Sequence, residues 1–156
     1  MRTTIVSITD SEETSRALDV YFNTCMAATV ESCFMTYRCS LLSGTLVRQA
    51  DIFVMDMFST DGTGPRAEGI FAAAKWLSLG KRALVISGAA CADSIQDSLY
   101  WDLASEDKLT DRVLSILANP VPPPSALAPL RAHFGKYCRP AEDPHNRLDR
   151  AAFFQQ

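Results

Sequence analysis

The chain has 156 residues, of which 47% are hydrophobic, 21% charged and 9% aromatic, the proportions of one compact domain rather than a fibre, a disordered chain or a repeat array. Its 15 Lys and Arg against 18 Asp and Glu give a formal net charge of -3, which excludes a general basic coat, so we expect no direct nucleic-acid binding. No apolar run reaches the roughly 18–20 residues of a membrane span, and no signal-peptide core follows Met1. We therefore expect a cytoplasmic protein without a membrane partner.

Apolar runs alternate with helical stretches in the first part of the chain. Thr4–Ile8 is expected to be a short strand, and Asp10 or Ser11 the N-cap of a helix that ends near Cys25. Residues 28–37 are β-branched and aromatic enough for a second strand, and residues 41–49 suit a short helix.

The alternation continues through the middle of the chain. Asp51–Met55 is apolar on both faces, as a central parallel strand must be. After a polar turn at residues 59–64, Pro65 suits the first position of a helix over residues 66–79 that Gly80 closes. Residues 82–87 are expected to form a fourth strand.

The last predicted elements are a helical stub at residues 92–98, a fifth strand at 99–103 and a helix over 106–117 capped by Ser105. Five strand–helix units in about 118 residues predict an α/β fold: a doubly wound, five-stranded parallel sheet of the flavodoxin type.

The proline-rich C-terminal part is set apart by its composition. Seven of the eight prolines lie between Pro120 and Pro144, and such a run must be extended. We therefore expect an α/β domain over residues 1–118 and a tail over 119–156. The tail carries five basic and three acidic residues. Leu127, Leu130, Phe134 and Tyr137 recur at helical spacing, so we expect a short helix that folds only against this domain or a partner.

Polar side chains follow three of the predicted strands. Asp10 follows the first strand, Asp56 the third and Ser87 the fourth. In an open parallel sheet, functional sites lie beyond the carboxyl ends of the strands. Two carboxylates and a hydroxyl at that edge suit Mg²⁺ or a phosphoryl group.

These residues resemble the receiver domains of two-component response regulators over about residues 2–118. Asp51-Ile-Phe-Val-Met-Asp56 resembles the third strand of the family, and Ile86-Ser87-Gly88-Ala89 its fourth-strand exit. The resemblance implies a CheY-like fold with Asp56 as phosphoacceptor, Ser87 beside it and Tyr100 as the aromatic switch. It also implies weak Mg²⁺ binding by Asp10, Asp56 and the backbone carbonyl of Phe58.

Two departures from the family pattern predict an atypical receiver. Thr9 stands where receivers have a second acidic residue, and Leu103-Ala104 where they have Lys-Pro. Without the lysine, a phosphoryl group at Asp56 lacks its cation. We therefore expect a receiver-like signalling module that binds a protein partner or forms a homodimer, with weak or absent phosphorylation.

A second function from a different class uses the same strand exit. Asp61-Gly-Thr-Gly-Pro-Arg-Ala-Glu68-Gly69, followed by Gly80-Lys81, is similar to nucleoside 2-deoxyribosyltransferases and related N-glycoside hydrolases. That resemblance implies Glu68 as a nucleophile at a sugar anomeric carbon.

Each candidate residue also has a structural interpretation. Asp10 suits a helix N-cap, Asp56 a loop cap, and Glu68 a first-turn carboxylate favoured by the helix dipole. Tyr100 suits a packing position. The five cysteines are odd in number and form no C-x-x-C motif, so we expect buried thiols rather than a zinc or redox site.

Overall fold

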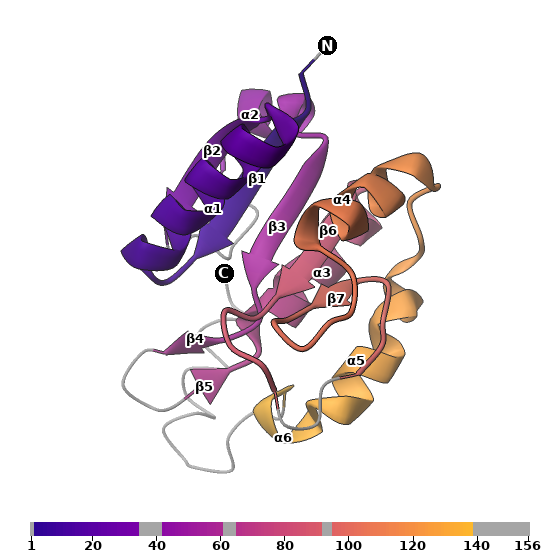
Figure 1. The fold of residues 1–156 in the computed structure, drawn as a ribbon. Helices are drawn as coiled ribbons and strands as arrows, with labels where there is room; N and C mark the ends of the chain where they lie inside the picture. Colours follow the sequence, from indigo (N-terminus) through magenta and orange to yellow (C-terminus); the bar gives the residue numbers. More distant parts are fainter. Residues whose placement is uncertain (1, 35–41, 61–64, 92–94, 139–156) are drawn as a thin grey trace.

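A computed structural model describes residues 2–34, 42–60, 65–91 and 95–138 of the chain. Five parallel strands form one sheet in the order β2-β1-β3-β6-β7 (Figure 1). The strands are β1 (Thr4–Thr9), β2 (Thr29–Phe34), β3 (Ile52–Asp56), β6 (Ala83–Ile86) and β7 (Tyr100–Trp101). The predicted doubly wound α/β fold is confirmed.

Four helices flank the sheet: α1 (Glu12–Met26), α2 (Gly44–Gln49), α3 (Glu68–Ser78) and α4 (Leu109–Ala118). Helices α1 and α4 lie together on one face, and α3 covers the opposite face (Figure 1). The hydroxyl of Tyr21 on α1 accepts a hydrogen bond of 3.2 Å from the backbone N–H of Thr110 on α4. This bond joins two helices that are far apart in the sequence.

Local capping explains where several helices begin and end. Ser11 caps α1, because its hydroxyl accepts the backbone N–H of Thr14 at 3.2 Å. Ser43 caps α2 in the same way through Leu46 at 3.1 Å. Gly80, just beyond α3, has a φ of 76°, the left-handed conformation that glycine adopts at low cost.

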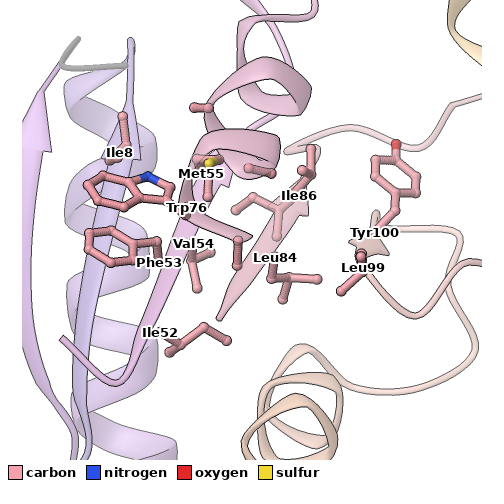
Figure 2. Packing of buried hydrophobic residues seen from close by; sticks show 14 of the residues in the cluster. Ile8, Ile52, Phe53, Val54, Met55, Trp76, Leu84, Ile86, Leu99 and Tyr100 are labelled. Atoms are coloured by element: carbon pink, nitrogen blue, oxygen red, sulfur yellow. The ribbon is translucent and has the colours of Figure 1, made fainter. Parts of the chain in front are cut away.

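The core lies on both faces of the central strand. All five residues of β3 are buried. On the α3 side, Trp76 stacks on Phe53 with ring centroids 3.7 Å apart, as Figure 2 shows. The buried indole N–H of Trp76 has no hydrogen-bond partner among the described residues, so its contact with Phe53 is an apolar one.

The boundaries of two predicted elements differ from the structure, and that of a third cannot be compared over its last residues. Pro65 lies in a short hairpin, β4 (Ser59–Thr60) with β5 (Pro65–Arg66), and α3 begins only at Glu68. Ser105 does not cap α4, because its hydroxyl accepts the backbone N–H of Asp102 instead. The predicted second strand extends to residue 37, and residues 35–37 lie outside the described residues.

The predicted fourth crossover helix, residues 92–98, is the largest difference. Residues 95–98 are not helical, and residues 92–94 lie outside the described part of the chain. Parallel strands are usually joined by a helix that covers one face of the sheet. In the described residues between β6 and β7, none does so.

A C-terminal segment (residues 124–138) lies beside α3 and β7 (Figure 1). It consists of η2 (Pro124–Leu127), α5 (Ala128–His133) and α6 (Gly135–Cys138). Leu127, Leu130 and Phe134 belong to the same hydrophobic core as the sheet. The boundary near residue 118 stays a prediction about independent folding, while in the structure residues on both sides of it share one core.

Among the described residues, no helix combines the length and apolarity needed to cross a membrane.

The side chain of Arg82 donates a hydrogen bond of 3.0 Å to the backbone carbonyl of Asn119. This bond anchors the chain where α4 ends and the proline-rich connection begins.

Candidate functional site

An acidic pair lies at the carboxyl edge of the sheet. Asp56 is the last residue of β3 and is only 8% exposed, and half-buried Asp10 follows β1 on the neighbouring strand. Burial, and after it the negative charge of Asp10, raise the pKa of Asp56 from 3.8 to about 7. Both causes disfavour the charged form, so the folded chain holds the Asp56 proton to a higher pH than an ordinary aspartate does.

The first turn of α3 lies directly against the backbone of Asp56. A Cβ atom at Gly69 would stand 2.0 Å from the Asp56 carbonyl oxygen and 2.9 Å from the Cα of Met57. The Gly69 N–H donates a hydrogen bond of 3.0 Å to the Met57 carbonyl, and the Met57 N–H donates one of 2.7 Å to Ile86. These contacts hold the end of β3 between α3 and β6.

Ser87 follows β6 and is buried, and its side chain forms hydrogen bonds within its own loop. Its hydroxyl donates a hydrogen bond of 2.8 Å to the carbonyl of Ala89. Among the described residues no side-chain hydrogen bond joins Ser87 to Asp56. The predicted role of Ser87 beside the phosphoacceptor therefore stays a prediction.

Tyr100 points inward and belongs to a polar cluster that the sequence analysis missed. Its hydroxyl donates a hydrogen bond of 3.1 Å to Oδ2 of Asp102 and lies 3.2 Å from the Sγ of Cys91. Burial, the hydrogen bond with Cys91 and the charge of Asp102 raise the pKa of Tyr100. The switch role of Tyr100 stays a prediction.

Asp102 is a carboxylate with no exposed surface. Besides Tyr100, it accepts the backbone N–H of Ala104 at 2.8 Å and that of Cys91 at 3.3 Å. A buried carboxylate requires such donors. The predicted fifth strand, residues 99–103, includes Asp102, so the sequence did not single it out; in the structure β7 ends at Trp101 and Asp102 follows it directly.

Phe58 connects the Asp56 edge to the C-terminal segment. Its ring packs edge-on against Tyr137, with centroids 5.0 Å apart, and against Phe134 at 6.0 Å. Phe134 also packs on Tyr100 at 5.5 Å. One segment therefore contacts residues that follow β3 and residues of β7.

The structure also places two other positions that the sequence analysis singled out. Glu68 is the first residue of α3, next to Gly69, and is half-buried. Leu103, where receivers have a lysine by the resemblance, is 62% exposed.

The acidic edge offers a cation few protein ligands. Among the described residues, no group of three or more His, Cys, Asp and Glu side chains could hold a metal ion. Mg²⁺ is usually bound by one or two carboxylates with water and phosphate oxygens completing its octahedron. The pair Asp10 and Asp56 supplies that minimal set of two carboxylates, and a cation would offset the charge repulsion that, after burial, raises the pKa of Asp56.

The fold is that of response regulator receiver domains. The N-terminal domain of a response regulator/sensory box/GGDEF three-domain protein from Carboxydothermus hydrogenoformans superposes with a TM-score of 0.56 at 16% identity, over 74% of this chain and 94% of that one. A Thermotoga maritima response regulator, solved with Mg²⁺ and beryllofluoride, gives a TM-score of 0.52 at 15% identity, over 73% and 98% of the two chains. No protein-family profile and no curated protein sequence matches the chain. The predicted receiver-like architecture is thus confirmed at the level of fold.

Proposed function

We propose that this chain is a receiver-like signalling module that acts by binding a protein partner or a second copy of itself, with weak or absent phosphorylation at Asp56. The single observation that carries the proposal is the state of Asp56. By the resemblance Asp56 is the phosphoacceptor; its pKa is raised to about 7, and exposed Leu103 stands where receivers have a lysine. Only a carboxylate attacks phosphorus, so protonation removes part of the nucleophile at neutral pH.

The charge balance at the edge supports weak phosphoryl transfer. A phosphoryl group adds close to two negative charges beside Asp10, which already repels the charge of Asp56. The position after the fifth strand holds exposed Leu103 rather than a cation. Neutralisation would then fall on Mg²⁺ held by Asp10, Asp56 and the backbone carbonyl of Phe58, where the metal would supply positive charge to the phosphoryl oxygens.

Incubation with acetyl phosphate and Mg²⁺, followed by intact-mass measurement, tests the proposal. We expect at most a small fraction of the chain to gain a phosphoryl group, and none in Asp56→Asn. Asp10→Asn removes one carboxylate ligand of the proposed Mg²⁺ site while keeping the phosphoacceptor, and should lose the remaining modification. Rapid stoichiometric modification of the wild-type chain at Asp56 would show that the module is an efficient phosphorylation switch, contrary to this proposal.

A further inference from the structure

The two edges of the sheet differ in how much backbone they present. At one edge β7 is only two residues long, whereas β2 at the other edge has six residues (Figure 1). Among the described residues, β2 pairs with β1 and with no other strand. An edge strand offers a row of unpaired N–H and C=O groups to another chain, and shortness is a common protection against such pairing. The protection holds for β7 and is absent from β2.

The outward backbone groups of β2 follow from its pairing with β1. The N–H of Thr29 donates a hydrogen bond of 2.9 Å to the carbonyl of Thr3, so the backbone of Thr29 faces β1. Successive residues of a strand direct their backbone groups to opposite sides. The N–H and C=O groups of Val30 and Ser32 therefore point away from the sheet, and no described residue outside it forms a backbone hydrogen bond with them.

The side chains of β2 leave this edge accessible. Thr29, Glu31 and Ser32 are exposed, and Val30 and Cys33 are half-buried. The strand contains no proline and no lysine, the residues that most often block pairing at an edge. Glu31 is its one charged residue, so the position of this carboxylate decides which strands can lie alongside.

The strand is also held ready for pairing. Its register with β1 runs without a bulge from Thr29 opposite Thr4 to Phe34 opposite Thr9. The hydroxyl of Ser7 on β1 donates a hydrogen bond of 3.4 Å to the hydroxyl of Ser32. A second chain would therefore meet an edge that is already extended and fixed, which lowers the ordering cost of association.

The sequence of β2 matches itself in one antiparallel register. Two copies related by a twofold axis must place outward-facing residues opposite each other, and two registers do so over most of the strand. With Ser32 on the axis, Glu31 faces the uncharged Cys33 of the second copy. With Glu31 on the axis, two carboxylates face each other directly, which is destabilising. Charge therefore favours the register with Ser32 on the axis.

We propose that two copies of this chain associate by antiparallel pairing of their β2 strands, with Ser32 on the twofold axis, so that two five-stranded sheets become one continuous sheet. The inference rests on the proposed function in one respect, because it names the second copy as the protein that the module binds. A single pair of strands buries less than the roughly 1,200 Å² of a stable interface, so the association is reversible and depends on concentration.

The first measurement is the mass of the full chain by sedimentation equilibrium over a concentration series. We expect the average mass to rise from 17.1 kDa toward twice that value. Ser32→Pro removes an N–H that the pairing with β1 does not use. It should weaken association by about tenfold or more, because the axis removes a hydrogen bond from each copy. Ser32→Ala is the matched control, since it also loses the bond to Ser7 but keeps the N–H, and should associate like the wild type.

The second measurement tests the register without a proline. Glu31→Cys places a thiol opposite Cys33 of the second copy, at the Cα separation of about 4.5 Å that a disulfide can span. The thiol oxidant diamide should then link two chains, and peptide mass spectrometry should find the bond between positions 31 and 33. The control combines Glu31→Cys with Cys33→Ser, keeps the other cysteines, and should form no link through position 31.

Each outcome bears on the β2 interface separately from the proposed function. A mass of 17.1 kDa at every concentration, or a dimer that Ser32→Pro leaves intact, overturns the interface. Linkage through position 31 that does not need Cys33 overturns the register. These results leave the proposed function standing with a different protein as partner. Efficient phosphorylation of Asp56 by acetyl phosphate would instead overturn the proposed function and leave a dimer through β2 intact.

Discussion

Gly69 and Asp56 lie backbone against backbone, closer than any side chain at position 69 would allow. The start of α3 is therefore seated on the residue that carries the candidate acidic site. A displacement of α3 at this point moves Asp56 itself.

Gly69→Ala is expected to lower the free energy of unfolding by about 1–3 kcal/mol, because the methyl group would overlap the Asp56 backbone rather than a flexible side chain. Urea unfolding monitored by tryptophan fluorescence measures the change. Gly88→Ala is the matched control, since a Cβ at Gly88 meets nothing within 4 Å. Equal stability of the two variants would contradict the tight contact.

The raised pKa of Asp56 predicts an unusual dependence of stability on pH. The folded chain binds this proton up to a pH of about 7, whereas an unfolded aspartate releases it near 3.8. Between these values the folded state holds more protons than the unfolded state, so stability falls as the pH rises through the window. Asp56→Asn should abolish this fall and be more stable than the wild type at pH 8, by on the order of a few kcal/mol.

Unfolding curves of both proteins at pH 5 and pH 8 provide the test. Asp10→Asn should have an intermediate effect, because it removes the smaller of the two causes of the pKa shift. If the stability of the wild type changes between pH 5 and pH 8 by the same amount as that of Asp56→Asn, then Asp56 titrates in the ordinary range.

Tyr100→Phe removes a donor to a carboxylate that has no exposed surface. We expect a loss of about 1–3 kcal/mol, the usual cost when a buried polar group loses its partner. Tyr21→Phe serves as the comparison, because its hydroxyl joins α1 to α4 in a half-buried position and should contribute less. Similar losses in the two variants would mean that water or another donor replaces Tyr100 at Asp102.

Deletion of residues 120–156 is expected to lower the melting temperature by at least several degrees. Leu127, Leu130 and Phe134 leave the core in this variant, and each buried side chain is worth about 1.5–3 kcal/mol before ordering costs. Deletion of residues 139–156 alone is the control and keeps all three. Identical melting of both truncations and the full chain, by circular dichroism, would show that the body over residues 1–118 is stable by itself.

Glu68 decides between the receiver-like function and the glycosyl-transfer alternative. If Glu68 is only a carboxylate in the first turn of α3, Glu68→Gln should lower the stability by about 0.3–1 kcal/mol and leave the release of free base unchanged. Glu12→Gln, in the first turn of α1, should behave alike. Release of free base from a nucleoside panel, followed by chromatography, would favour the alternative if the wild type shows it and Glu68→Gln does not.

The sequence by itself determined the order and type of the central elements. Apolar runs such as Ile52–Met55 are buried wherever they occur in a parallel sheet, and Ser11 can cap its helix through residues three positions away. Because these signals are local, the strands and helices could be predicted from them, while the placement of Asp10 and Asp56 at one edge followed only from assuming the flavodoxin-type strand order that the structure has. The resemblance to receivers rested on the same local runs.

Only the tertiary structure decided what surrounds those residues. Asp102, Cys91 and Tyr100 form a cluster because the β6–β7 connection folds back onto the end of β7, and no periodic pattern encodes that return. The docking of Phe134 on Phe58 joins residues 76 positions apart in the chain. Helical spacing predicted an apolar face for the C-terminal segment. It could not predict which surface of the sheet this face packs against, because that depends on where, among the described residues, no crossover helix covers the sheet.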